Sequence, residues 1–218
     1  MSLRKQRIQY HFSVEGETEK WYLQWLQQQI NNNPRALYQV VFLVKVEPNP
    51  ESYVKKISIV NKTEIVHFFD FEGTEEKYQK RINSTLDSLK NAKKRKSITY
   101  EIAYSNYAFE LWILLHRGTF CKPLSHRGQY LDSINTLFHE NFEDLRQYKK
   151  EDNFKRLLAK LTLNDVYVAI KNAQKINLEN QRVQKKTQYK GYEYYLQNPS
   201  LSVGEVIENI LKKVGLYT

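Results

Sequence analysis

The sequence has a single cysteine and few glycines and prolines. Cys121 excludes an intramolecular disulfide and any zinc site made of cysteines alone, and it fits a reducing compartment. The 7 glycines and 5 prolines are too few for a turn-rich β-sandwich or a disordered chain. The sequence of 218 residues therefore predicts a cytoplasmic globular protein with a sizeable core.

Long apolar runs and nucleotide-binding loops are also missing. No apolar run approaches the ~20 residues that span a bilayer, so we expect no membrane partner. The basic residues Lys5 and Arg7 are soon followed by Glu15 and Glu17, which is not the pattern of a signal peptide. The chain has no Gly-x-x-x-x-Gly-Lys-Ser/Thr loop, so any ATP hydrolysis must come from a partner protein.

Acidic residues are outnumbered by basic ones, 24 against 34, which gives a formal net charge of +10. This balance favours an anionic partner such as nucleic acid. Two basic clusters stand out, at 90–96 and 171–190, and the second leads into several tyrosines. That mixture suits a single-stranded nucleic acid, although a solvated helix end and loop would look the same. The candidate nucleic-acid-binding residues are Lys93, Lys94, Arg95, Arg182, Lys185, Lys186 and Tyr189.

The hydrophobic pattern alternates between strands and helices as far as Gly118. Strands are predicted at 8–14, 38–46, 65–69 and 98–104, and helices at 18–30, 51–60, 74–92 and 108–116. Such alternation predicts an α/β fold with a mainly parallel four-stranded sheet flanked by helices.

The pattern changes after Gly118. Helices are predicted at 130–138, 153–161, 166–176 and 203–214, and no convincing strand is visible. We therefore expect residues 1–118 to form an α/β domain and residues 119–218 to form an α-helical extension that packs on it.

Acidic residues follow two of the predicted strands directly. Glu15 ends the first strand, and Asp70 and Glu72 end the third. Sites in open parallel sheets form at the carboxyl ends of the strands. Asp70 and Glu72 would point the same way in extended backbone. Carboxylate oxygens suit Mg²⁺ or Mn²⁺, so Glu15, Asp70 and Glu72 are the predicted metal ligands.

Further candidates lie on the helices that follow these strands. Glu15, Glu19 and Glu110 are the candidate catalytic acids, although Glu17 and Glu19 would also suit the positive end of a helix. Glu110 lies in a nearly all-apolar helix, where an unpartnered charge is costly, so we expect it to face the acidic site. His116, on the same helix, is either a core histidine or a catalytic one.

The chain resembles the RloB-like, or AbiLii-like, family in four blocks. These are Val-Glu-Gly-Glu-Thr-Glu at 14–19, Phe-Asp-Phe-Glu at 69–72, the segment 105–116, and Asn-Pro-Ser-Leu-Ser-Val at 198–203. The resemblance implies a Toprim-type, Rossmann-like domain. It assigns Glu15 to acid–base chemistry or metal binding, and Asp70 and Glu72 to Mg²⁺. The acid-x-acid pair ends here in glutamate instead of aspartate, which lengthens one ligand by a methylene.

The resemblance also implies a function. RloB-like proteins resemble Toprim nucleases encoded beside an ABC- or AAA-type ATPase in phage-defence loci. It therefore implies a toxin that cleaves nucleic acid, RNA such as tRNA more than DNA, with such an ATPase as partner. The alternative is a non-catalytic subunit that binds nucleic acid or the ATPase. A homodimer is possible.

Overall fold

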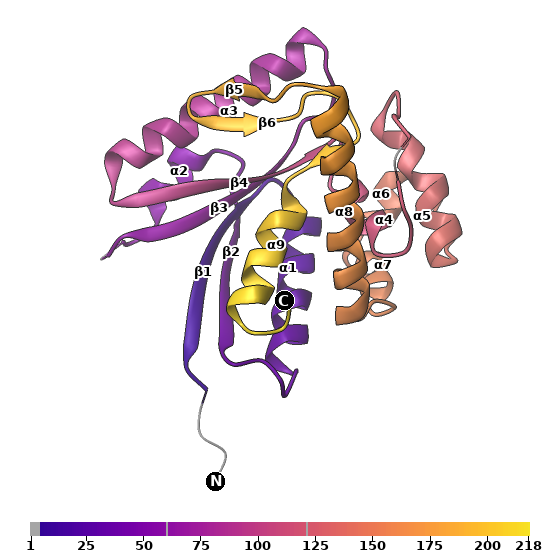
Figure 1. The fold of residues 1–218 in the computed structure, drawn as a ribbon, viewed down its shortest axis with the longest axis horizontal. Coiled ribbons are helices and arrows are strands. Elements are labelled where there is room, and N and C mark those ends of the chain that lie inside the picture. The colour runs from indigo at the N-terminus through magenta and orange to yellow at the C-terminus, as the bar shows by residue number, and fades with distance from the viewer. Residues whose placement is uncertain (1–4, 60, 121) are drawn as a thin grey trace.

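The computed structural model describes residues 5–59, 61–120 and 122–218. Its five-stranded sheet has the order β2-β1-β3-β4-β7 (Figure 1). The first four strands are parallel, as predicted, and β7 pairs antiparallel with β4. The strands are β1 (Arg7–Val14), β2 (Gln39–Val46), β3 (Thr63–Asp70), β4 (Ile98–Asn106) and β7 (Ser200–Leu201). The α/β prediction is confirmed.

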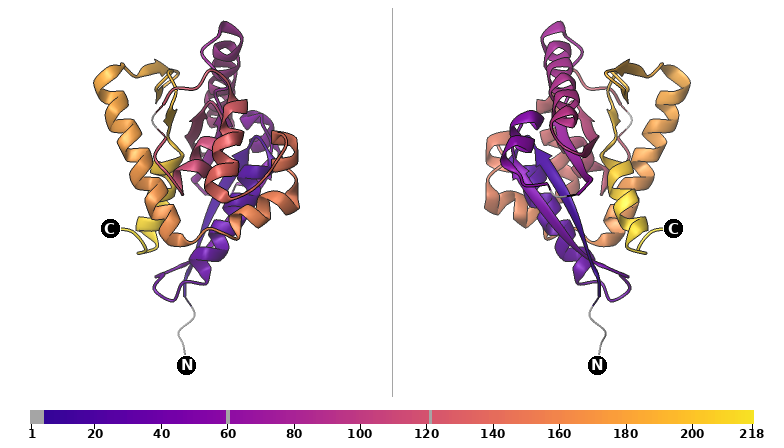
Figure 2. Two further views of the ribbon diagram at one scale, coloured as in Figure 1. Left: turned by 90° about the vertical axis from the view of Figure 1, so that its right-hand side faces the viewer. Right: turned by 90° about the vertical axis from the view of Figure 1, so that its left-hand side faces the viewer.

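Helices cover both faces of the sheet, so β3 is buried from two sides (Figure 2). Val66 and Phe68 join one core cluster, and Ile65 and Phe69 join the other. This is the two-sided burial that a continuous apolar strand requires. The second cluster lies under α2 (Pro50–Lys56) and α3 (Glu76–Arg95). The helix predicted at 51–60 ends earlier, at Lys56, and Val60 lies outside the described residues.

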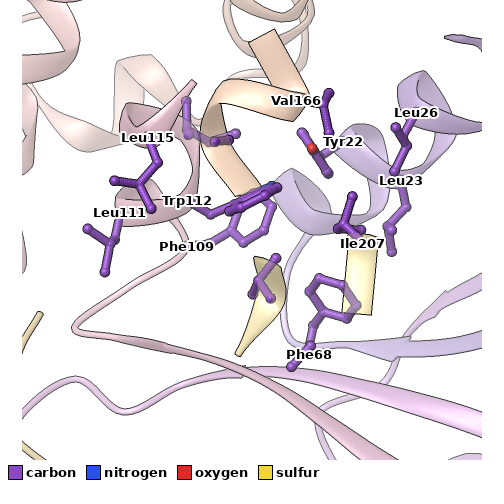
Figure 3. Close-up of a cluster of buried hydrophobic side chains, with 14 of the residues drawn as sticks. Tyr22, Leu23, Leu26, Phe68, Phe109, Leu111, Trp112, Leu115, Val166 and Ile207 are labelled. Carbon is purple, nitrogen blue, oxygen red and sulfur yellow. The ribbon is translucent and has the colours of Figure 1, made fainter. Parts of the chain in front are cut away.

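The first cluster joins the two halves of the chain. It packs α1 (Glu17–Asn31) and α4 (Glu110–Leu115) against helices that follow Gly118, as Figure 3 shows. Those helices are α5 (Tyr130–Phe138), α6 (Leu145–Tyr148), α7 (Glu151–Leu158), α8 (Leu163–Val183) and α9 (Val203–Lys213), with a 3₁₀ turn η1 (Arg127–Gln129) before them. None of the described helices is long and apolar enough to cross a membrane.

His116 belongs to this core. One ring nitrogen lies 2.9 Å from the Trp112 carbonyl and the other 3.1 Å from the Tyr22 hydroxyl. Burial lowers the pKa of His116 to about 4, so the ring is neutral at pH 7. The core interpretation of His116 is therefore the one that the structure supports.

The expectation that no strand follows Gly118 is wrong. A hairpin forms from β5 (Thr187–Tyr189) and β6 (Tyr192–Tyr194), and β7 adds an edge to the sheet. The hairpin turn consists of Lys190 and Gly191, both with positive φ, which is the turn geometry that matches strand twist. Tyr192 and Tyr194 are buried while Glu193 is exposed, so a period of two was present but short.

Candidate active site at the carboxyl edge of the sheet

The predicted acidic residues lie at one edge of the sheet because β1, β3 and β4 are parallel. Glu15 follows β1, Asp70 ends β3, and Glu110 begins the helix after β4. The backbone N–H of Asp70 donates a hydrogen bond of 3.2 Å to Glu15 Oε2, which joins the ends of the two strands. The predicted meeting of Glu15 with Asp70 is therefore present.

An arginine on α3 links Glu15 to Glu72. Arg81 Nη2 lies 3.1 Å from both carboxylate oxygens of Glu15, and Arg81 Nη1 lies 2.5 Å from Glu72 Oε2. Arg127 approaches Glu72 from the other side, with Nη1 2.8 Å from Oε1. We call Glu15, Arg81, Glu72 and Arg127 the arginine-bridged chain. Its guanidinium groups neutralise the two carboxylates.

Glu72 does not point as the sequence predicts. Its φ is 59°, in the left-handed region that few non-glycine residues adopt. The backbone therefore turns directly after β3, and the premise of an extended Asp70–Glu72 segment is wrong. Two backbone hydrogen bonds hold this turn, from Phe71 N–H to the Ser105 carbonyl and from Glu72 N–H to the Tyr107 carbonyl, both 3.0 Å long.

A second group of acids lies deeper. Glu19 and Glu110 are only 4% and 1% exposed. With Asp70 and Lys149 they form what we call the buried acidic cluster, in which each carboxylate influences its neighbours electrostatically. Lys149 Nζ lies 2.8 Å from Glu110 Oε1 as an ion pair, but neither carboxylate oxygen of Glu110 has a hydrogen-bond partner among the described residues.

The pKa values in this cluster are shifted by burial and by mutual repulsion. Burial and the carboxylates of Glu19, Glu110 and Glu15 raise the pKa of Asp70 well above its usual value. Burial raises the pKa of Glu19 to about 7 against a hydrogen bond from the Thr18 hydroxyl, which is 2.9 Å long. Burial also raises the pKa of Glu15, and Arg81 opposes that shift. Of these three groups, Glu19 is the one whose pKa lies near neutral pH, where a carboxyl group can both accept and release a proton.

Replacing Glu19 by Gln is expected to stabilise the metal-free protein at high pH. The folded-state pKa of about 7 exceeds the ordinary 4.5, so Glu19 binds its proton more tightly in the folded protein. The free energy of unfolding that is lost by ionising the buried Glu19 is zero below its ordinary pKa, grows as the pH rises, and reaches its full value above the folded-state pKa. Urea unfolding in EDTA should show a gain of up to about 3 kcal/mol for Glu19→Gln near pH 8 and almost none near pH 4.5.

Glu17→Gln is the matched control for this measurement. Glu17 lies on the same helical turn but is exposed and pairs with Lys20 at 2.9 Å. The free energy of unfolding of the Glu17→Gln variant should differ little from that of wild type, and the difference should be the same at both pH values. A pH-independent effect of Glu19→Gln would contradict the assignment of Glu19 as a strained buried acid.

The two predicted basic clusters are brought together by the hairpin. Lys93 Nζ lies 4.7 Å from the centre of the Tyr192 ring, and the Tyr189 hydroxyl donates a hydrogen bond of 3.2 Å to Asp87. We call this region of α3 and the hairpin the basic surface. Its exposed cations include Lys93, Lys94 and Arg95 on α3, Arg182 at the end of α8, and Lys185 and Lys186 in the segment that leads into the hairpin.

The tyrosines beside these cations are not free to stack on bases. Tyr192, Tyr194 and Tyr195 are buried, and only Tyr189 is partly exposed. The interpretation of this stretch as core packing therefore holds for those three. The basic surface also lies away from the acids, since the segment of α3 from Arg81 to Lys94 spans ~20 Å.

Three cations that pair with the candidate acids were missed in the sequence: Arg81, Arg127 and Lys149. Arg81 lies in a polar helix among many cations, Arg127 begins the 3₁₀ turn η1, and Lys149 lies between the short helices α6 and α7. No local pattern separates them from other surface cations, because only tertiary structure brings them to the acids. The excess of acids at strand ends was the one available signal, since such acids need cations nearby.

The described part of the chain holds no preformed metal site. No three histidine, cysteine or acidic side chains are close enough together there to bind an ion. The positions between the carboxylates are taken by Arg81 and Lys149.

Comparison with protein families gives one match. The model of the family described as RloB-like protein matches residues 12–210, which is most of the chain. Comparisons with curated proteins and with solved structures give no match. The matched segment contains every residue of the arginine-bridged chain and of the buried acidic cluster. The chain therefore belongs to the RloB-like family of defence-related proteins.

Proposed function

We propose that the protein is a metal-dependent endonuclease that hydrolyses phosphodiesters in RNA such as tRNA. The observation that carries this proposal is the buried acidic cluster. Glu19, Asp70 and Glu110 lie together at the carboxyl edge of a parallel sheet, where they destabilise one another unless a cation is near. A structural role alone gives no reason to keep such a costly arrangement.

The donor groups suit Mg²⁺ or Mn²⁺. Glu15, Asp70 and Glu72 would hold the ion through carboxylate oxygens, the ligands that these cations prefer. Glu110 is paired with Lys149 through Oε1, and its other carboxylate oxygen has no ion-pair or hydrogen-bond partner among the described residues, which fits a centre that a further positive charge completes. Arg81 has to release Glu15 and Glu72 for them to share an ion, and its side chain, 47% exposed, is free to do so.

A bound divalent cation would supply charge stabilisation for the phosphate and an activated water. The protein residues would handle the protons and the geometry. Glu19, with a pKa of about 7, is suited to accept or donate a proton near neutral pH. Lys149 holds Glu110 in place at 2.8 Å, and Arg81 keeps Glu15 and Glu72 near each other until the ion binds.

The basic surface would hold the substrate strand at a distance from the cleavage site. Its cations neutralise phosphates without reading sequence, which suits an RNA several nucleotides long. The formal charge of +10 supports binding to a polyanion. The choice of RNA, the role as a toxin and an ABC- or AAA-type ATPase partner that supplies ATP hydrolysis are part of this proposal, and the resemblance to RloB-like proteins supports them.

A non-catalytic subunit is the second candidate. The observation that favours it is the pairing of Glu15, Glu72 and Glu110 with the protein's own cations, Arg81, Arg127 and Lys149. Such a protein would bind nucleic acid or the ATPase without cleaving anything.

Cleavage separates the two candidates. Purified protein is incubated with total cellular RNA in Mg²⁺, in Mn²⁺ or in EDTA, and the RNA ends are sequenced. An endonuclease should give discrete new ends with either metal ion and none in EDTA. Intact RNA in both metal ions, from protein that melts cooperatively, would favour the non-catalytic subunit.

A further inference from the structure

A pocket of about 300 Å³ opens beside the acidic site. The loop after β3, residues 72–75, forms one wall, and residues 125–128 form the opposite wall. Glu72 lies in the lining, so the pocket adjoins the arginine-bridged chain directly. Its volume is at the lower end for small-molecule sites and suits a ligand of the size of one nucleotide.

Arg127 supplies the positive charge of this pocket. Its side chain is 53% exposed and makes one ion pair, to Glu72 at 2.8 Å. A guanidinium has five N–H donors, so most of the donors of Arg127 are available to an incoming anion. Because a phosphate accepts paired hydrogen bonds from a guanidinium, Arg127 suits a phosphate at the edge of the acidic site.

The loop that carries Arg127 is held in shape before any ligand binds. Gln129 Oε1 accepts hydrogen bonds from the Ser125 N–H at 2.8 Å, the Ser125 hydroxyl at 3.1 Å and the His126 N–H at 3.3 Å. The His126 side chain in turn accepts from the Gln129 backbone. This capping arrangement fixes the η1 turn and so the position of Arg127, which reduces the ordering cost of binding.

The opposite wall is aromatic and closely fitted. A Cβ atom on Gly73 would lie 2.8 Å from the Tyr78 ring and 3.3 Å from the Tyr107 ring, so only glycine lets both rings approach the loop. The φ of Gly73 is 151°, which other residues rarely adopt. Glu75 also lines the pocket, and its carboxylate is paired with Lys77 at 2.9 Å, so Arg127 is the cation that faces an incoming anion.

We propose that this pocket binds one nucleotide of the substrate strand, with its phosphate on Arg127 and its base against Tyr78, the partly exposed ring of the wall. The pocket would set the strand so that the adjoining phosphodiester lies at the acidic site. The proposal rests on the proposed nuclease function, and it adds a binding site for the residue next to the cleaved bond.

Binding is tested without cleavage. Fluorescence anisotropy in EDTA measures the affinity of the full-length protein for a fluorescein-labelled single-stranded octaribonucleotide at several salt concentrations. Arg127→Ala should weaken binding about tenfold and should lower the slope of log affinity against log salt by about 0.7, one phosphate contact. Uridine 5′-monophosphate should compete with the RNA on wild type and not on Arg127→Ala.

Arg35→Ala is the matched control, because Arg35 is an exposed arginine in the connection between α1 and β2. It should bind like wild type, and both variants should keep the melting temperature of wild type since neither side chain is buried. Equal RNA affinities of wild type and Arg127→Ala would contradict the proposal that this pocket binds a nucleotide. Equal losses of RNA affinity in Arg127→Ala and Arg35→Ala would also contradict it.

Failure of the pocket and failure of the nuclease proposal give different results. If Arg127→Ala loses RNA binding but no preparation ever cleaves RNA, the pocket stands as a binding site and the nuclease proposal falls. If wild type cleaves RNA and Arg127→Ala does so with unchanged KM, the nuclease proposal is supported and nucleotide binding in the pocket is contradicted.

Discussion

Asp70→Asn is expected to abolish metal-dependent cleavage while making the metal-free protein more stable. Asn keeps the shape of Asp but removes the negative charge that a cation needs, so cleavage should fall by about a thousandfold or more. A variant damaged in folding would lose both activity and stability. The opposite directions of the two effects therefore distinguish a functional acid from a structural one.

The gain in stability follows from the direction of the pKa shift. Burial, with the charges of Glu19, Glu110 and Glu15, raises the pKa of Asp70 above its ordinary 3.8. An acid of this kind costs nothing below its ordinary pKa and lowers stability as the pH rises toward its folded-state pKa. Asn removes that cost, so the stability difference should grow as the pH rises from about 4 toward the folded-state pKa.

The measurements are RNA cleavage in Mg²⁺ and melting temperature in EDTA across that pH range. Asp152→Asn makes the same chemical change at an exposed position on α7 and should leave both unchanged. Mn²⁺ should raise the melting temperature of wild type by mass action and should not raise that of Asp70→Asn. Full cleavage by Asp70→Asn would exclude Asp70 as a metal ligand.

The α/β fold was predictable because burial leaves a strong local pattern. The apolar run of β3 indicates a strand covered on both sides, and its two core clusters confirm that reading. The β5–β6 hairpin was missed because three-residue strands give too few alternations to recognise. The pair Lys190-Gly191 was the available signal, although Asn-Gly or Asp-Gly would have been a clearer one.

The site was predictable in its acids and not in its cations. Glu15 and Asp70 follow strands, and parallel strands bring their carboxyl ends to one edge, so their proximity follows from topology. Arg81, Arg127 and Lys149 reach the acids through long-range contacts that leave no trace in local sequence. The left-handed turn at Glu72 likewise depends on hydrogen bonds to the segment after β4.

The distribution of charge has a functional consequence under the nuclease proposal. The acids lie at the carboxyl edge, while the basic surface lies ~20 Å along α3. Arg81 occupies the middle of the arginine-bridged chain, where it pairs with both Glu15 and Glu72. Cleavage would therefore require both a bound strand and the release of Glu15 and Glu72 from Arg81.

Lys149→Met is expected to destabilise the protein more than any other single change to a surface-reaching cation. Lys149 is the only basic side chain within 4.0 Å of Glu110 among the described residues, and Glu110 is 1% exposed. Burial alone would lower the pKa of Lys149, but the carboxylates of Glu110, Asp70 and Glu19 outweigh it and raise that pKa. Without Lys149 these buried carboxylates lose their common counter-ion.

Removing one partner of a buried ion pair costs about 3–5 kcal/mol. We expect about 3 kcal/mol for Lys149→Met, the lower end, because 38% of the Lys149 side chain is exposed and water screens part of the charge. Urea unfolding near pH 7.5 measures this loss. Lys150→Met, a change at the exposed neighbour, should have almost no effect.

A second substitution tests the cause. Glu110→Gln removes the charge that Lys149 neutralises, so the double variant Lys149→Met with Glu110→Gln should recover most of the lost stability. The double-mutant cycle then gives a coupling energy for the pair that is separate from the loss of side-chain packing. If the effect of the double variant equals the sum of the effects of Lys149→Met and Glu110→Gln, Lys149 stabilises the protein through its methylene chain. The acids at this edge would then not depend on Lys149 for charge compensation.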